Sequence, residues 1–392
     1  MKKNIRFLFF VLFPVYTLSA QQAPSPQTAQ VKSRYYEVVS DRGGADAEAL
    51  SRELEGRFIV YNRLFRFNPG NLIVPLKVRA YGNKTDYDSY ISARLGETRP
   101  GAVYLHYNQT ERRELVIHRG SDDEGRLLPH QAFIQFLRAF IPNPPAWLRE
   151  GFGIYFSTLT LNSVTGALEY EENLSWLETV KNLQDRAPTP ESVLLADIQG
   201  IPENFQSVSW ALVSFFLNSG KEDYFRTITE SFMVLSPPAS AAQNSEAVFN
   251  HITLWADLKN LEGDYYAYIA ARKTFAELLE EGQRAYAAKD PEAAELAFMG
   301  ALDQKPTHYA PYYYLGLLSY EEKNYNLAEH YYRSALQYGA DSALVSYALG
   351  INAAAAGRRE TAIGFLEQAA ATSPERYRQK AAELIARLRL PD

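Results

Sequence analysis

The clearest chemical signal in this sequence is the stretch LPHQAFIQFLRAFIPNPPAWLREGFGIYF, which covers residues 128–156. His130 lies near the start of a predicted helix, and Glu150 follows it 20 residues later in a Glu-Gly pair. A catalytic zinc ion usually has three protein ligands, and two of them are often His residues four apart on one helical face. A Glu beside the first His then takes a proton from the zinc-bound water. In this sequence, however, Gln131 follows the first His and Ile134 stands four residues after it.

These two residues cannot perform the chemistry of the residues that they replace. The alkyl side chain of Ile134 offers no metal ligand, and the amide of Gln131 is not basic near neutral pH. We therefore treat His130, Gln131, Ile134 and Glu150 as vestigial positions and predict no catalytic residue, no bound metal and no cofactor. The structural explanations of the two remaining groups are a hydrogen-bonded core or cleft position for His130 and a helix-dipole interaction for Glu150. The alternative is a zinc-dependent peptidase with a nonstandard ligand set, in which His118 supplies a ligand, although the chain would still lack a general base.

The elements that would position these residues are strands followed by helices. The predicted strands are YYEVVS, LIVPLKVRAYG, GAVYLHYN and RELVIHRG. A helix between the first two strands has apolar residues at helical spacing, namely Leu50, Leu54, Phe58 and Tyr61. A second helix, over residues 127–140, has the apolar stripe Phe133, Phe136, Leu137 and Phe140. Because the strands come first and the helices later, the pattern predicts an α+β domain over residues 34–271.

Four segments of this domain resemble the peptidase MA-like family of gluzincin metallopeptidases, which are bacterial domains often joined to tetratricopeptide repeats. The segments are ALSRELEGRFIVYNRLFRFNPGNLIVPLKV, LPHQAFIQFL, PPAWLREGFGIYFST and SVSWALVSFFLNSG. The resemblance implies a gluzincin-like fold, with His130 and Glu150 at two zinc-ligand positions. It places Ile134 at the second His ligand and Gln131 at the catalytic Glu. The resemblance therefore implies the fold but argues against the activity.

The sequence beyond Lys273 repeats with a period of 34 residues. The positions that recur are Gly282, Gly316 and Gly350; Ala294, Ala328 and Ala362; Ala301, Ala335 and Ala369; and the bulky Phe298, Tyr332 and Leu366. Gly and Ala allow two antiparallel helices to approach closely, and the bulky residue fills the space beside them. This period and these residue types resemble the tetratricopeptide repeat. We predict an all-α solenoid over residues 272–392, with repeats at about 275–308, 309–342 and 343–376, followed by a capping helix.

The first helix of each repeat is expected to face a concave groove. The predicted partner-binding residues are Leu279, Gln283, Tyr286, Tyr313, Leu317, Tyr320, Tyr347 and Ile351. This set is apolar and aromatic and lacks the Lys and Arg cluster that would bind a terminal carboxylate. We predict that the groove takes an apolar strip, such as a partner helix or an extended peptide. The alternative is that helices of the same chain cover this face.

The first 20 residues are predicted to be a signal peptide. A basic start is followed by a mostly apolar stretch that is too short to span a bilayer. Residues 21–33 are predicted to be a polar linker. With no Cys in the chain, disulfides and thiol chemistry are excluded, and the bacterial periplasm or cell envelope is the expected location. Membrane contact is expected only if the signal segment is retained.

The net charge of -6 provides no basic excess for phosphate neutralisation, so we predict no nucleic-acid partner. The sequence thus predicts an exported, non-catalytic scaffold that binds a protein or peptide. A third hypothesis is that the cleft around His130 and Glu150 still binds peptide without cutting it.

Overall fold

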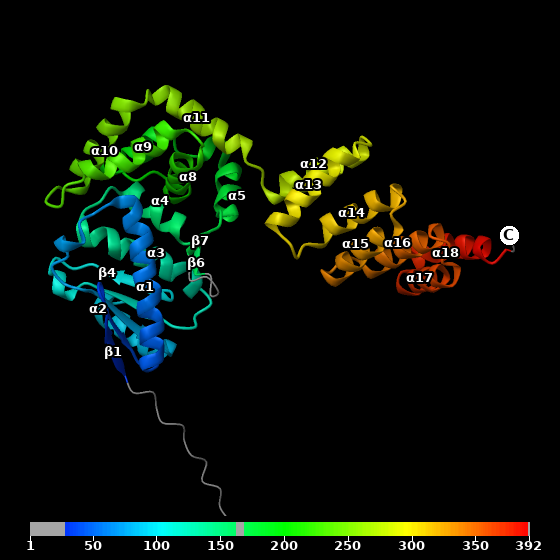
Figure 1. Cartoon of the computed structure of the whole chain (residues 1–392), viewed down its shortest axis with the longest axis horizontal. Coiled ribbons are helices and arrows are strands. Elements are labelled where there is room, and N and C mark those ends of the chain that lie inside the picture. The colour runs from blue at the N-terminus through cyan, green and yellow to red at the C-terminus, as the bar shows by residue number, and fades with distance from the viewer. Residues whose placement is uncertain (1–27, 162–167, 391–392) are drawn as a thin grey trace, which may run out of the picture. The chain divides into compact units, whose positions relative to one another are not determined.

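The computed structural model describes residues 28–161 and 168–390, which fall into two compact units (Figure 1). The first unit runs to Pro142 and includes Phe156–Tyr170, and the second comprises Asn143–Tyr155 and the chain from Glu171. The predicted signal peptide lies outside the described residues. The strands are β1 (Ala29–Lys32), β2 (Tyr36–Ser40), β3 (Leu76–Tyr81), β4 (Ala102–Leu105), β5 (Glu114–His118), β6 (Leu159–Leu161) and β7 (Leu168–Tyr170).

The first unit is built on a five-stranded mixed sheet with the strand order β1-β2-β3-β5-β4. The three central strands are parallel, whereas β1 and β4 run antiparallel to their neighbours at the two edges. The register pairs Val38 with Val78 and Val78 with Leu115, so these apolar residues share one face. Val116 has the opposite orientation and packs against Tyr87. Both faces of the sheet are therefore covered.

Helices α1 (Gly44–Phe65) and α3 (Glu124–Phe140) form the main core of this unit, and α2 (Lys84–Leu95) covers the other face through Tyr87. The predicted apolar residues of α1 and α3 are all buried. Ring centroids of Phe58 and Phe136 lie 5.1 Å apart, and those of Tyr61 and Phe133 lie 5.3 Å apart. Such edge-to-face pairs stabilise the helix contact beyond simple burial. The two predicted helices are thus confirmed, and α3 begins at Glu124 rather than at residue 127.

The linker predicted over residues 21–33 differs from the structure at its end. Ala29–Lys32 forms β1 and pairs antiparallel with β2, with Val31 opposite Val38. The segment is polar because it is an edge strand that alternates between half-buried and exposed residues. Composition alone cannot separate such a strand from a linker, since its order comes from backbone pairing with a distant segment.

Within the described residues, the second unit begins with eight helices, and most side chains of the central one, α8, are buried. These helices are α4 (Ala146–Phe156, in this unit up to Tyr155), α5 (Leu174–Leu183), α6 (Pro190–Leu194), α7 (Ala196–Gln199), α8 (Phe205–Asn218), α9 (Glu222–Ser231), α10 (Ala241–Trp255) and α11 (Leu258–Ala271). Lys181 in α5 forms an ion pair of 2.7 Å with Glu277 in α12 (Phe275–Ala287), the first repeat helix. Helices α5 to α11, and α4 up to Tyr155, belong to the same compact unit as the repeats.

The repeats are three helical hairpins with the predicted period. They pair α12 with α13 (Pro291–Gln304), α14 (Tyr309–Glu321) with α15 (Tyr325–Gln337), and α16 (Ser342–Ala355) with α17 (Arg359–Thr372). Each hairpin turns through a residue of positive φ, and these residues, Lys289, Lys323 and Gly357, are spaced 34 apart. The same backbone geometry therefore recurs three times with different side chains.

The recurring glycines make the close helix contact that the sequence predicts. A Cβ added at Gly316 would lie 2.6 Å from the ring of Tyr332, and one at Gly282 would lie 2.5 Å from the ring of Phe298. At Gly350 the nearest atom would be Leu366 Cγ, at 2.8 Å. Carbon atoms in contact normally lie about 3.5–4.0 Å apart. Each hairpin thus requires glycine opposite its bulky residue.

The array ends with α18 (Pro374–Leu388), the predicted capping helix. Its buried residues Tyr377, Ala381 and Ile385 recur at helical spacing, and its other positions are mostly exposed. A polar outer face is what a terminal repeat needs because no further repeat covers it. Among the helices of the described residues, none has the length and apolar character to cross a membrane.

Candidate functional site

Helix α3 holds three of the four residues predicted as vestigial. The amide oxygen Oε1 of Gln131 accepts a hydrogen bond of 2.9 Å from the backbone N–H of Tyr104 in β4. Because β4 is an edge strand, this bond satisfies a backbone group that the sheet leaves open. Ile134 is buried, and His130 is half-buried. Gln131 and Ile134 therefore have hydrogen-bonding and packing roles where a peptidase would need a base and a ligand.

His118, the predicted substitute ligand, lies at the end of β5. Its imidazole stacks on the ring of Tyr87, with centroids 5.8 Å apart. Across residues 28–161 and 168–390, no three His, Cys, Asp or Glu side chains are close enough together to hold a metal ion. The donors in this part of the chain do not fit the zinc ion that the resemblance implies.

Glu150 lies in α4, where neighbouring side chains hold its carboxylate. Its Oε1 accepts a hydrogen bond of 2.8 Å from Arg149 Nε, and its Oε2 accepts one of 3.4 Å from Gln206 Nε2. The adjacent Gly151 has a packing role, because a Cβ there would lie only 2.4 Å from the carbonyl oxygen of Ser209 in α8. In this pair Gly151 allows α4 to approach α8 closely, and Glu150 places a carboxylate beside α8.

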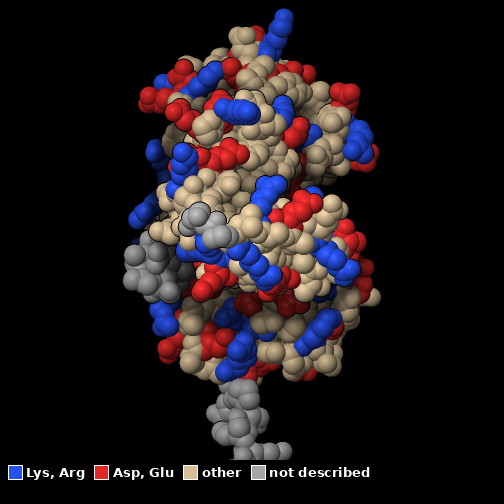
Figure 2. All heavy atoms as spheres, turned by 90° about the vertical axis from the view of Figure 1, so that its right-hand side faces the viewer, with Lys and Arg blue, Asp and Glu red and all other residues tan. Residues whose placement is uncertain are grey.

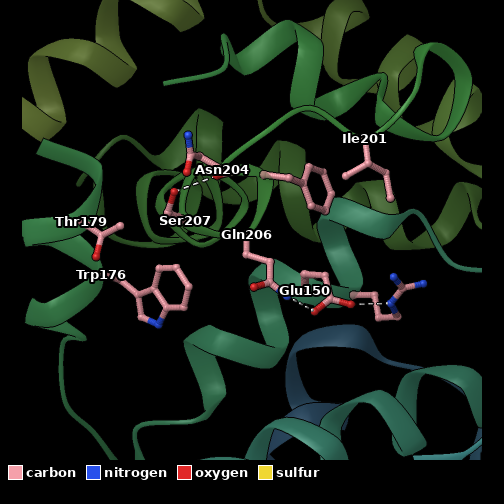
Figure 3. A pocket seen from close by; sticks show the side chains of 9 residues that line it. Glu150, Trp176, Thr179, Ile201, Asn204, Gln206 and Ser207 are labelled. Carbon is pink, nitrogen blue, oxygen red and sulfur yellow. Dashed lines mark hydrogen bonds and ion pairs between the residues drawn. The ribbon is translucent and has the colours of Figure 1, made fainter. Parts of the chain in front are cut away.

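The Glu150 side chain lines a cavity of about 480 Å³ (Figure 3). Helices α4, α5 and α8 and the loop before α8 line this cavity with Arg149, Glu150, Trp176, Thr179, Ile201, Asn204, Phe205, Gln206 and Ser207. Figure 3 shows Trp176 and Thr179 on one side of it and Ile201 on another. A cavity of this size lies within the range of about 300–1,000 Å³ that is typical of small-molecule sites. The sequence analysis predicted only Glu150 among these residues.

In the repeats, all eight predicted groove residues are half-buried. Contacts within the array explain this partial burial. Tyr313, Leu317 and Tyr320 pack against the buried cluster around Tyr332. Tyr347 contacts Tyr377 of the capping helix, with ring centroids 4.9 Å apart. Each predicted groove side chain therefore packs part of its surface against the solenoid core and exposes the rest to solvent.

One groove residue also links two successive repeats. The Tyr286 hydroxyl donates a hydrogen bond of 2.6 Å to the Glu321 carboxylate, and Leu279 and Tyr286 pack against the cluster around Phe298. Burial, followed by this contact with Glu321, raises the pKa of the Tyr286 hydroxyl. The hydroxyl therefore remains protonated at neutral pH and acts as a donor between the helices.

The charged side chains on the face drawn in Figure 2 are mixed in sign, with Lys and Arg among Asp and Glu. Such a surface differs from the basic stripe of a nucleic-acid-binding domain. The net charge of -6 agrees with this view.

No protein-family model matches the sequence, and no curated protein matches it. Among solved structures, the chain is similar to YrrB, described as a TPR protein with an unusual peptide-binding site, at 15% identity and a TM-score of 0.26, covering 52% of this chain and 93% of YrrB. It is also similar to the Cut9-Hcn1 hetero-tetramer of APC/C, at 13% identity and a TM-score of 0.29, covering 69% of this chain and 57% of that chain. The three hairpins of this chain have the 34-residue period and the glycine contacts that are typical of tetratricopeptide repeats.

Proposed function

We propose that this protein is an exported, non-catalytic scaffold that binds a protein or peptide through its tetratricopeptide repeats. The observation that carries the proposal is the recurring hairpin, whose first helices place the predicted groove residues at half-buried positions. Half-buried apolar and aromatic side chains are held in place by the core yet still have surface to offer a partner. Export is proposed from the basic and apolar character of residues 1–20.

The chemistry of the groove favours an apolar partner segment. The predicted residues are Tyr, Leu, Ile and one Gln, and they include no cation for a terminal carboxylate. Apolar grooves of this kind take an amphipathic helix or an extended peptide with apolar side chains. Tyrosine suits such a site because it combines a large apolar ring with a hydrogen-bonding hydroxyl and few rotatable bonds.

For the region before the repeats, we propose an inactive relative of the gluzincin peptidases. The support is chemical. Gln131 accepts a backbone hydrogen bond from β4, and Ile134 packs into the core, so neither supplies a base or a ligand. The competing function is a zinc-dependent peptidase with a nonstandard ligand set. Metal analysis of the purified full-length protein separates the two, because our proposal predicts well under one zinc per chain and no chelator-sensitive peptide cleavage.

The groove is tested by capture of the partner from the native envelope. Tyr313→Ala with Tyr320→Ala removes two aromatic contacts, and each such contact is worth about 2 kcal/mol at a binding hot spot, or roughly thirtyfold in affinity. The matched control is Tyr266→Ala, because Tyr266 is an exposed tyrosine in α11, outside the repeats. Loss of the co-purifying protein in the double variant, with retention in the control, supports the groove. Equal capture by the wild type, the double variant and Tyr266→Ala rejects the groove as the binding site.

A further inference from the structure

The cavity beside Glu150 shares no lining residue with the predicted groove of the repeats. It is lined by side chains from three helices and a loop, and all of them belong to the second compact unit. Its lining comprises two aromatic side chains, one Ile, several neutral polar groups and the Arg149–Glu150 ion pair. This composition restricts the chemistry of a molecule that could occupy it.

The charged groups of the cavity balance each other. Arg149 donates to Glu150 through Nε at 2.8 Å, and both side chains are largely buried. A ligand with a net negative charge would lie close to the Glu150 carboxylate, and a ligand with a net positive charge would lie close to the Arg149 guanidinium. Since repulsion of like charges weakens both cases, the cavity suits an uncharged ligand.

The remaining polar groups favour a ligand that donates and accepts hydrogen bonds. Within the described part of the chain, the Asn204 amide and the Trp176 indole N–H have no hydrogen-bond partner. Gln206 uses only its Nε2 atom, toward Glu150, so its amide oxygen is available. A purely apolar ligand would remove these groups from water without replacing the lost hydrogen bonds, which is unfavourable.

The apolar side of the cavity consists of ring and alkyl surface. Trp176 is half-buried, Phe205 is buried, and Ile201 is 63% exposed. A purely apolar ligand would match only this ring and alkyl surface. A sugar ring instead has hydroxyl groups at its rim, which donate and accept, and an apolar face of C–H groups that can lie on an indole ring.

From this combination we infer that the cavity binds an uncharged saccharide, with one ring against Trp176 and with hydroxyl groups hydrogen-bonded to Asn204 and Gln206. The Arg149–Glu150 pair contributes further donors and acceptors at the edge of the same cavity. The inference is independent of partner binding by the repeats, because none of the lining residues belongs to the predicted groove.

The test is titration calorimetry of the full-length protein with three neutral probes: maltotriose, cellotriose and tri-N-acetylchitotriose. Binding of at least one probe, with a tenfold or greater loss of affinity in Trp176→Ala and in Asn204→Ala, supports the site. The control is Trp255→Ala, since Trp255 is an exposed tryptophan in α10 outside the cavity, and this variant should bind like the wild type.

A second variant guards against misfolding of the alanine variants. Thr179 is exposed at the cavity wall, and its hydroxyl bonds only to the Ser175 carbonyl in the same helix, so Thr179→Phe should fill the cavity while sparing the core. This variant should abolish binding and keep the wild-type unfolding midpoint. Failure of all three saccharides to bind, or binding that Thr179→Phe leaves unchanged, overturns the inference. Tighter binding of a neutral blocked tripeptide at the same site also overturns it.

Discussion

Replacement of Gly316 by alanine tests the helix contact on which the repeats depend. An added Cβ would lie 2.6 Å from both Cδ1 and Cε1 of Tyr332 and 3.1 Å from Cζ. The Tyr332 side chain is only 1% exposed, and its ring also contacts Tyr313 at a centroid distance of 5.9 Å. The ring therefore cannot move aside without disturbing the groove side of the repeat.

The size of the effect follows from two opposing terms. Overpacking of a well-packed core typically costs about 1–3 kcal/mol. Alanine in place of glycine favours a helix by about 1 kcal/mol, which offsets part of that cost. Gly316→Ala should therefore lower local stability by up to ~2 kcal/mol. The matched control is Gly364→Ala in α17, where no neighbouring atom lies within 4 Å of the added Cβ, so only the favourable term applies. The two variants should differ by about 1–3 kcal/mol.

Amide hydrogen exchange of the full-length protein, followed by mass spectrometry, measures this difference within each hairpin. Peptides from α14 and α15 in Gly316→Ala should lose protection, whereas peptides from α17 in Gly364→Ala should gain it. A difference of about 1–3 kcal/mol corresponds to roughly 5- to 150-fold in exchange rate. If the two substitutions change the protection of their own hairpins equally, relative to the wild type, the close contact between Gly316 and Tyr332 is refuted.

Two further predictions concern single residues. His308 is the N-cap of α14, and burial, followed by the nearby Lys305, lowers the pKa of its imidazole. The contribution of neutral His308 to stability is therefore present above the unfolded pKa of 6.5 and is lost as the pH falls through the folded pKa. His308→Asn, which keeps a capping side chain, should remove this pH dependence of hydrogen exchange in α14. Gly151→Ala should lower the free energy of unfolding by about 3 kcal/mol or more, because its Cβ would meet the backbone carbonyl of Ser209 at 2.4 Å. Gly263→Ala, where no neighbouring atom lies within 4 Å, should leave the urea midpoint unchanged or raise it.

The sequence predicted the repeats well because their information is local and recurs. The spacing of Gly282, Gly316 and Gly350 fixed the hairpin period, and each glycine does face the bulky residue that the pattern paired with it. The apolar stripe of α3 was equally readable, since a helix contains its own hydrogen bonds and its side chains repeat every 3.6 residues.

The features that sequence reasoning missed depend on segments that are distant along the chain. Ala29–Lys32 is a strand only because β2 pairs with it. The cavity brings Trp176 of α5 together with Asn204 before α8, and no spacing rule relates them. Asn204 does carry a local signal, a positive φ of 58°, but this becomes visible only in the structure.

The Glu-Gly pair illustrates how one motif can hold two kinds of information. The sequence suggested a chemical role for Glu150, whereas Gly151 is explained by the approach of α4 to α8. Similarly, Gln131 was identified as a residue that cannot act as a base, and the structure adds that its amide oxygen holds the edge strand β4. Which backbone group it would bind could not be derived from the sequence, because that group comes from a separate element.

Site-specific photo-crosslinking tests the central claim, partner binding by the repeat groove, most directly. A benzophenone amino acid is placed at Leu317, a predicted groove position, or at Gln337, an exposed position on α15. Our account predicts that irradiation of the native envelope gives a protein adduct from Leu317 that is lost when Tyr313→Ala and Tyr320→Ala are added, and no such adduct from Gln337. An adduct only from Gln337, or one from Leu317 that survives the two tyrosine substitutions, would contradict it.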